Sequence, residues 1–164
     1  MKLSRFALLS GLVLLASGAC ADQIVVPTEN AATAGDGLLN TLIRDTGNPR
    51  TYQVVISRAE LAAMPPGSII TGVTYRLAAT AANATAWPAA EVAYTQYDIQ
   101  VGSSNYAPAA METTFANNQA LDTITARSGA WTIPAGSFPG GALAPAVNAC
   151  GLFIPFTAGF QYTG

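Results

Sequence analysis

Short runs of alternating apolar and polar residues, each ended by glycine, proline or asparagine, constrain the fold of this chain most. The clearest run covers residues 69–77 and places four apolar side chains on one side at a period of two residues, namely Ile69, Val73, Tyr75 and Leu77. A period of two is that of a β-strand, and the breaks between runs come too soon for long helices. The sequence therefore predicts an all-β fold.

Residues 94–101 form a second alternating run. One side is apolar and carries Tyr97, Ile99 and Val101, and the other side carries Tyr94, Gln96, Asp98 and Gln100. Such alternation is typical of a sheet with one buried and one solvated face. Further strands are predicted at residues 23–26, 38–44, 51–56, 122–127, 130–133 and 151–156, with a turn at residues 45–49. This number of strands favours an antiparallel two-layer β-sandwich of the jelly-roll kind.

One short helix is predicted between these strands. Ser57 and Glu60 have the spacing of a capping box, in which the serine accepts a hydrogen bond from a free backbone N–H and the glutamate reaches back. Pro65 and Pro66 end the helix, because proline has no N–H to donate and its ring clashes with the preceding turn. We expect a crossover helix near residues 57–64.

The first 21 residues have the pattern of a secretory signal peptide. Lys2 and Arg5 precede a short apolar run at residues 6–16, and small residues follow this run. We expect cleavage before Asp22 and a protein that is secreted or held at the cell surface. The remaining residues 22–164 are enough for one domain with a hydrophobic core, so we expect a single β-sandwich domain.

The two cysteines lead to separate expectations. Cys20 stands where a lipoprotein carries its lipid, but Ser17 replaces the usual aliphatic residue, so lipid anchoring is the alternative to simple cleavage. Cys150 is then the only cysteine of the exported chain, which excludes an intrachain disulfide. Its apolar neighbours favour a small buried thiol over a reactive or intermolecular one.

After the leader, the chain has no lysine and no histidine. Five arginines face nine carboxylates, a formal charge of minus four, and the arginines are Arg44, Arg50, Arg58, Arg76 and Arg127. So few cations bind the phosphates of nucleic acid poorly, and no nucleic-acid partner is expected. No apolar run after the leader reaches the length of about 20 residues that a membrane-spanning helix needs.

The lack of histidine excludes the commonest hydrolytic designs. Ser-His-Asp and Cys-His systems and histidine-based zinc sites cannot form, and no glycine-rich phosphate loop follows a strand. A glycoside hydrolase needs only two carboxylates that face each other. The central candidates for such a pair are Glu91, Asp98, Glu112 and Asp122. Their spacing specifies no pair, and we favour the interpretation that they are solvated surface carboxylates.

Side chains with oxygen atoms in two turns are candidate ligands for a calcium ion. Residues 45–48 and the group Asn117, Asn118 and Asp122 contain the carboxylates and amides that calcium prefers. Neither set matches a defined calcium loop, and tight turns use the same residue types for their own hydrogen bonds. We expect no metal and no cofactor.

The polar side of residues 94–101 is the candidate ligand face. Flat aromatic rings stack on sugar rings, while amides and carboxylates bind the surrounding hydroxyl groups. The candidate glycan-binding residues are Tyr94, Gln96, Asp98, Gln100 and Trp87, with Tyr106 as a further ring. The alternative is an ordinary polar sheet face, with Trp87 and Trp131 packed in the core or over an edge.

Several segments together resemble a known group of exported proteins. They are Thr51-Tyr52-Gln53-Val54-Val55, Pro66-Gly67-Ser68-Ile69-Ile70-Thr71-Gly72-Val73-Thr74-Tyr75-Arg76, Tyr97-Asp98-Ile99-Gln100-Val101-Gly102, Thr113-Thr114-Phe115-Ala116-Asn117-Asn118 and Phe153-Ile154-Pro155-Phe156. The chain resembles exported bacterial β-sandwich proteins that often carry a PEP-CTERM sorting tail. The resemblance implies a surface location, and it implies an aliphatic strand and a tail after residues 156–164. This chain has neither, so we expect a truncated chain; the group brings no established activity.

These patterns favour a non-enzymatic, exported β-sandwich protein of the cell surface or extracellular matrix, with a structural or adhesive role and weak glycan binding. The expected partners are extracellular polysaccharides or cell-surface components. Contact with a membrane is expected only through the missing tail or, as the alternative, through a lipid on Cys20. A carbohydrate-active enzyme that uses a carboxylate pair is the alternative function.

Overall fold

The computed structural model describes residues 23–34, 43, 47 and 50–164, so the leader, the predicted strand at 38–44 except Ile43, and the predicted turn except Gly47 lie outside it. The described strands are β1 (Ile69–Val73), β2 (Val92–Tyr94), β3 (Ile99–Val101), β4 (Ile124–Arg127), β5 (Trp131–Ile133) and β6 (Ile154–Gln161). The described helices are α1 (Phe115–Asn118) and the 3-10 helices η1 (Thr28–Asn30), η2 (Arg58–Leu61), η3 (Ala81–Asn83) and η4 (Pro108–Ala110). None of these helices is long or apolar enough to span a membrane.

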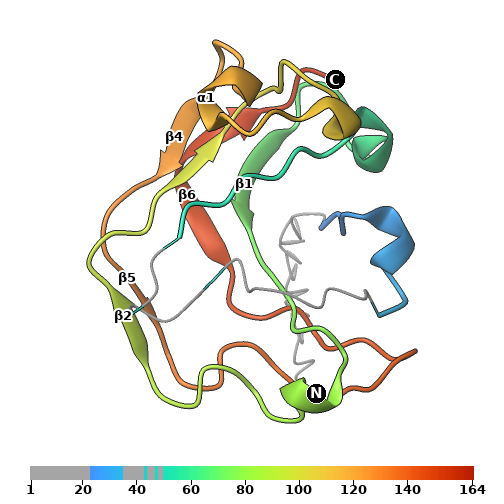
Figure 1. Ribbon diagram of the computed structural model, residues 1–164, viewed down its shortest axis with the longest axis vertical. Helices are drawn as coiled ribbons and strands as arrows, with labels where there is room; N and C mark the ends of the chain where they lie inside the picture. Colours follow the sequence, from blue (N-terminus) through green and yellow to red (C-terminus); the bar gives the residue numbers. More distant parts are fainter. Residues whose placement is uncertain (1–22, 35–42, 44–46, 48–49) are drawn as a thin grey trace, which may run out of the picture.

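The described strands pair in twos, and every pair is antiparallel. β1 pairs with β6, β2 with β5 and β3 with β4. The predicted all-β class is confirmed, because the strands and extended segments are joined by helices of only a single turn (Figure 1). Shorter forms of three predicted strands are found, those at residues 69–77, 122–127 and 130–133, whereas β6 starts later than the strand predicted at residues 151–156 and extends beyond it.

All the pairings follow one nested order. From the open end to the closed end, the pairs are Ile69 with Gln161, Val73 with Ile154, Trp87 with Phe138, Tyr94 with Trp131, Val101 with Ile124 and Ser104 with Gln119. The chain therefore runs out over residues 69–104 and returns over residues 119–161, with outgoing residues opposite returning ones. This part of the chain is one long hairpin that folds back on itself (Figure 1).

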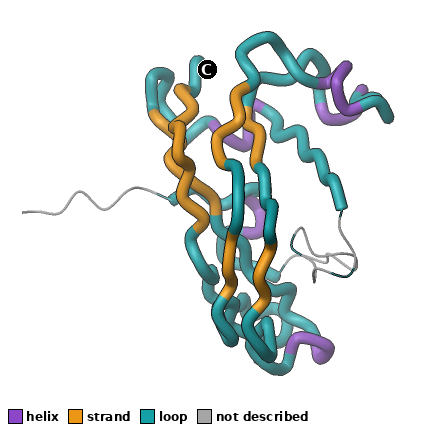
Figure 2. The backbone as a smooth tube through the Cα atoms, turned by 90° about the vertical axis from the view of Figure 1, so that its left-hand side faces the viewer, coloured by secondary structure: helices purple, strands orange, loops and turns teal. Residues whose placement is uncertain are grey.

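Residues 87–104 and 119–138 form the central part of this hairpin, which we call the long ribbon. Its two strand pairs, β2 with β5 and β3 with β4, follow each other in line along the ribbon (Figure 2). Both pairs share one register, apart from a one-residue shift at Ile99. The long ribbon is thus a single ladder with one interruption in its middle.

The interruption changes which side chains face inward. Thr95 and Gln96 are both exposed, so the alternation of residues 94–101 changes phase at this point. Tyr94 and Tyr97 were predicted on opposite sides, but their ring centroids lie only 5.5 Å apart. That part of the prediction is wrong, because a period of two holds only while the ladder is unbroken.

The core lies where the two arms of the folded hairpin meet. Its buried apolar side chains are Ile43, Ile133, Phe138 and Ile154. The ring of Trp87 packs on that of Phe138, with a centroid distance of 5.7 Å. Gly151 approaches Phe138 so closely that a Cβ atom at this position would lie 2.2 Å from the ring. Only glycine therefore lets the returning chain pass over Phe138.

A bulge in β6 brings this strand against β4. The β1–β6 ladder shifts register between Ile70 and Gly72, so β6 has extra residues at this point. Thr157 is one of them, and its hydroxyl donates to the carbonyl oxygen of Ala126 in β4 at 3.1 Å. The end of the returning chain therefore packs against the long ribbon (Figure 1).

Residues 23–26 form no strand, so that prediction is wrong. The segment that follows them is held by a side chain: the guanidinium of Arg76 donates to the carbonyl oxygens of Asn30, Ala31 and Thr33. The planar fork of an arginine can serve several acceptors at once. This contact joins residues far apart in the chain, and an alternation pattern does not reveal it.

The predicted helix at residues 57–64 is shorter than expected. The hydroxyl of Ser57 accepts the N–H of Glu60 at 3.4 Å, as a capping box requires, but η2 has only four residues. The carboxylate of Glu60 accepts the N–H of Thr28 at 2.5 Å instead of reaching back. Residues 51–56 belong to none of the described strands, and the strand predicted across the turn from them, at residues 38–44, lies outside the described residues except for Ile43.

One prediction near the end of the chain is also wrong. Cys150 is exposed instead of buried. The inward positions on either side of it are taken by Asn148, which is buried, and by Gly151, which packs on the core.

We expect the substitution Ile133→Ala to lower the free energy of unfolding by about 2–5 kcal/mol, because Ile133 is fully buried and its removal leaves a cavity. The matched substitution Leu121→Ala removes a fully exposed side chain and should change it by less than about 0.5 kcal/mol. Chemical denaturation of both variants measures the difference. Equal effects at the two positions would contradict the described core.

Candidate functional site

The candidate glycan-binding residues divide between an exposed surface and a half-buried one. Gln96, Asp98 and Gln100 are exposed on the outer face of the long ribbon, and Gln100 accepts a hydrogen bond from the amide of Gln119 at 2.9 Å. Tyr94 is half-buried, and its ring packs against the core. We call Gln96, Asp98 and Gln100, together with the exposed Ser128 and the half-buried Gln119, the polar strip.

The side chains of the polar strip bind one another. The amide of Gln96 donates to the carboxylate of Asp98 at 2.5 Å and to the hydroxyl of Ser128 at 3.0 Å. The N–H of Gly129 donates to the same carboxylate at 3.2 Å. The hydrogen bond from Ser128 is the main cause that lowers the pKa of Asp98, and the bonds from Gly129 and Gln96 add to it. Asp98 is therefore charged at neutral pH.

Three rings and one guanidinium meet beneath the interruption of the long ribbon, and we call this group the aromatic cluster. Trp131 stacks on Tyr94 with a centroid distance of 5.9 Å and lies 4.6 Å from Tyr97. The guanidinium carbon of Arg127 is 5.9 Å from the ring centroids of both Tyr97 and Trp131, within the range of cation–π attraction. Burial raises the pKa of Tyr97, so its phenol stays protonated.

Arg127 also replaces part of the missing ladder at the interruption. Its guanidinium donates to the carbonyl oxygens of Tyr97 at 2.7 Å, Gly129 at 3.2 Å and Ala130 at 2.8 Å. The N–H of Tyr97 donates to Gly129 at 2.9 Å, the one backbone bond that crosses this gap. A side chain thus supplies donors to three backbone acceptors around the gap, which the sequence pattern did not predict.

The two outlying rings lie at opposite ends of the long ribbon. Trp87 exchanges two backbone hydrogen bonds with Phe138, at 2.9 and 2.8 Å, and packs its ring on it. Tyr106 lies beyond the last bridge at Ser104, where its hydroxyl binds the carboxylate of Glu112 and this bond raises the pKa of Tyr106. The structure therefore does not bring these two predicted rings together.

Three of the four candidate catalytic carboxylates, those of Asp98, Glu112 and Asp122, accept hydrogen bonds from their own neighbours. Asp122 accepts the N–H of Ser103 at 2.9 Å and its hydroxyl at 2.6 Å, and these bonds lower the pKa of Asp122. Glu112 accepts the amide of Asn117 at 2.6 Å, and this bond, with one from a tyrosine hydroxyl, lowers the pKa of Glu112. Glu91 is exposed immediately before β2. No two of these carboxylates share a hydrogen-bond donor.

Asn118, one of the candidate calcium ligands, is buried and engaged by three hydrogen bonds. Its amide donates to the side chain of Gln53 at 2.8 Å and to the carbonyl oxygen of Glu112 at 2.9 Å, and its oxygen accepts the N–H of Glu112 at 2.9 Å. These bonds tie residues 51–56 to the closed end of the ribbon. Within the described part of the chain, no three acidic, cysteine or histidine side chains group closely enough to hold a metal.

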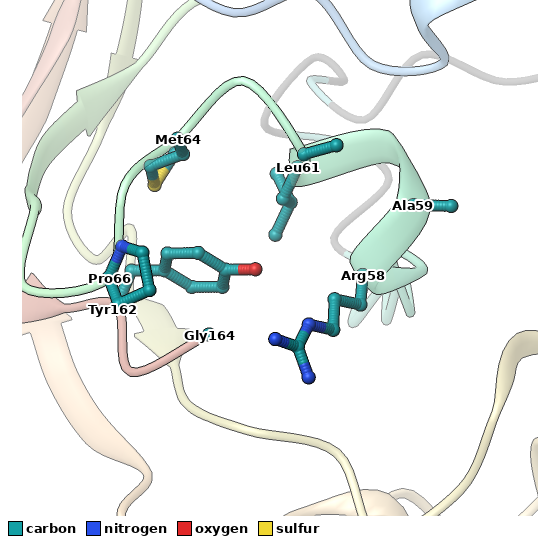
Figure 3. Close-up of a pocket in the computed structure, with 8 residues that line it drawn as sticks. Arg58, Ala59, Leu61, Met64, Pro66, Tyr162 and Gly164 are labelled. Carbon is teal, nitrogen blue, oxygen red and sulfur yellow. The ribbon is translucent and has the colours of Figure 1, made fainter.

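A pocket that sequence reasoning missed opens beside the end of the β1–β6 pair (Figure 3). It has a volume of about 510 Å³ and is lined by Arg58, Ala59, Leu61, Ala62, Met64, Pro66, Tyr162 and Gly164. Tyr162 is fixed in place, because its carbonyl oxygen accepts the N–H of Gly67 at 2.7 Å and its own N–H donates to Ser68 at 2.8 Å. The two walls come from distant parts of the chain, so no local pattern signals the pocket.

The fold and these sites define a β-rich protein built from antiparallel strand pairs. No protein-family model matches the chain, and no curated protein and no solved structure matches it. The resemblance to exported proteins with a sorting tail therefore stays an expectation from the sequence. The function has to be inferred from the described residues themselves.

The substitution Ser128→Ala should raise the pKa of Asp98 toward its ordinary value of 3.8, because Ser128 is the main cause of its lowering. A carboxyl group whose pKa is lower in the folded than in the unfolded protein stabilises the fold at pH values above its ordinary pKa. This stabilisation is lost as the pH falls through the lowered pKa. The variant should therefore lose less stability than the wild type as the pH falls below about 4. Carboxyl carbon NMR measures the pKa, and that of Asp122 should stay unchanged as an internal control.

The substitution Arg127→Lys should lower the free energy of unfolding by about 1–2 kcal/mol, since a lysine cannot serve all three carbonyl oxygens and the interruption then leaves acceptors unsatisfied. Arg50→Lys, at an exposed arginine, is the matched control and should have almost no effect. Thermal or chemical unfolding of the pair measures the difference. An unchanged stability of Arg127→Lys would mean that water satisfies these oxygens equally well.

Proposed function

We propose that this protein is an exported, non-enzymatic β-sandwich module with a structural or adhesive role at the cell surface or in the extracellular matrix. The nested pairing supports a jelly-roll sandwich, because such folds arise when a long antiparallel hairpin folds back on itself. The contact between β6 and β4 is one step toward such closure. The signal-peptide pattern of residues 1–21 supports export.

The state of the carboxylates is the observation that carries the non-enzymatic role. Hydrogen bonds from neighbouring groups lower the pKa of Asp98, Glu112 and Asp122. A glycoside hydrolase needs a general acid whose pKa is raised, so that it still holds a proton at the working pH. These carboxylates are charged and accept hydrogen bonds from neighbouring turns and strands, so they suit a role in stabilising the conformation of the surface.

The polar strip is the surface to which we assign weak glycan binding. It presents amide N–H groups, amide oxygens and one carboxylate along the exposed face of the long ribbon. Sugar hydroxyl groups both donate to and accept from such groups. The aromatic cluster beneath the strip packs the ribbon into one conformation. The ribbon therefore loses less conformational entropy when a ligand binds. Extracellular polysaccharides or cell-surface components are the proposed partners.

Electrophoresis through gels that contain a soluble polysaccharide tests this assignment. The protein should be retarded by at least one neutral polysaccharide, and Asp98→Asn should weaken the interaction by about threefold to fivefold, the scale of an exposed charged contact. Glu91→Gln removes an equally exposed carboxylate outside the polar strip and should leave the retardation unchanged. Equal losses in both variants would contradict the polar strip as the binding surface.

The alternative function, a carbohydrate-active enzyme, is tested with the same protein and polysaccharides. Release of new reducing ends, abolished by Glu112→Gln or Asp122→Asn, would replace the proposal with a hydrolase. Constant levels of reducing ends over a day, together with measurable retardation in the gels, would support the binding module. If neither retardation nor hydrolysis is observed, the assignment of glycan binding is contradicted and only the structural role is left.

A further inference from the structure

Two aspartates close the two ends of the β3–β4 pair in opposite directions. Asp98 lies on the outgoing chain just before β3, and its carboxylate accepts the N–H of Gly129 on the returning chain at 3.2 Å. Asp122 lies on the returning chain shortly before β4, and its carboxylate accepts the N–H of Ser103 at 2.9 Å and the hydroxyl of the same residue at 2.6 Å. Each aspartate therefore precedes one strand and binds the chain that follows the partner strand.

The residue that each aspartate binds is also held through its carbonyl group. The carbonyl oxygen of Gly129 accepts the N–H of Tyr97 at 2.9 Å, and that of Ser103 accepts the N–H of Ala120 at 3.1 Å. At both ends, a carboxylate thus binds an N–H that a backbone carbonyl would bind in a regular ladder. We call these groups the Asp98 clasp (Asp98, Tyr97 and Gly129) and the Asp122 clasp (Asp122, Ala120 and Ser103).

The clasps are more important for β3 than for β4. The pairing of these two strands is short, and a register shift interrupts it next to Ile99. β4 is also held by β6, because the hydroxyl of Thr157 donates to the carbonyl oxygen of Ala126. Among the described strands, β4 is the only one that pairs with β3. The outgoing chain at β3 is therefore the side that separates when the clasps weaken.

Both carboxylates are charged at neutral pH because of the hydrogen bonds that they accept. The bond from Ser128 is the main cause that lowers the pKa of Asp98, and the bond from the hydroxyl of Ser103 is the main cause that lowers the pKa of Asp122. Arg127 adds to the lowering at Asp98, and an arginine does not titrate in acid. The stabilisation is present above the ordinary pKa of 3.8 and is lost as the pH falls through the lowered pKa.

We propose that the two clasps form an acid-sensitive closure, so that in acid β3 separates from β4 at both ends while the core stays folded. A charged acceptor binds an N–H about twice as strongly as a neutral one, so protonation weakens both clasps. The core around Ile133, Phe138 and Ile154 is made of apolar side chains and loses no such bond. This conformational device goes beyond the proposed structural or adhesive role.

Hydrogen exchange of single amides between about pH 7 and about pH 3 tests the proposal, because this range includes the loss of both charges. The reporters are the N–H groups of Tyr97 and Ala120, since each crosses the hairpin inside one clasp. Their protection, corrected for the intrinsic exchange rate at each pH, should fall by about threefold to fivefold in acid, the scale of an exposed charged contact. The amides of Trp87 and Phe138 cross the same hairpin without a carboxylate and should keep their protection.

Each clasp has its own variant. Asp122→Asn keeps the shape and one acceptor oxygen but loses the charge. The amide of Ala120 should therefore be less protected at neutral pH and stop responding to acid, while that of Tyr97 responds as in the wild type. Asp98→Asn should have the reverse effect. Glu91→Gln removes an exposed carboxylate outside both clasps and should change neither response.

Three results would overturn the proposal. In the first, the amides of Tyr97 and Ala120 stay protected in acid. In the second, they lose protection together with those of Trp87 and Phe138, which would mean that the whole fold opens. In the third, each amide still responds to acid in the variant of its own clasp. The protection of Trp87 and Phe138 also shows that each variant is folded. No polysaccharide is present in these measurements, so their outcome is independent of the proposed glycan binding.

Discussion

The burial of Ile133, Phe138 and Ile154 against one another is the constraint on which the rest of the structure depends. A two-stranded ribbon alone has too little apolar surface to be stable in water, so it must cover one face with another part of the chain. Here residues 151–154, which lead into β6, supply that cover, and they pass closely enough only because Gly151 has no side chain to collide with Phe138. The absence of a side chain at Gly151 thus permits the contact that buries one face of the ribbon and forms the core.

The interruption of the long ribbon shows how packing and hydrogen bonding compensate each other. The ladder loses regular pairing between β2 and β3, and a bend at this place lets three aromatic rings face the same side. Arg127 then serves two needs, since its charge lies over two of the rings and its N–H groups bind the backbone oxygens left at the bend. The outer face above it remains polar, with Gln96, Asp98 and Ser128 joined by hydrogen bonds.

The sequence predicted the features that depend on local patterns and missed those that depend on distant partners. Alternation located β1, β4 and β5, since each has one inward-facing side. It failed at Tyr94 and Tyr97, because one extra exposed residue reverses the phase without altering composition. Among site residues, the exposure of Asp98 followed from the pattern, but its partner Ser128 lies on the returning arm. The Arg58–Tyr162 pocket was missed for the same reason.

The nested order of the pairings has a consequence for how the chain can reach this structure. Ile69 and Gln161 are far apart in sequence, and closing so large a loop directly costs much chain entropy. Once Ser104 and Gln119 have paired, however, each further pair closes only a small additional loop. Assembly can therefore proceed like a zipper from the closed end outward, and the effective contact order is much lower than the sequence separations indicate.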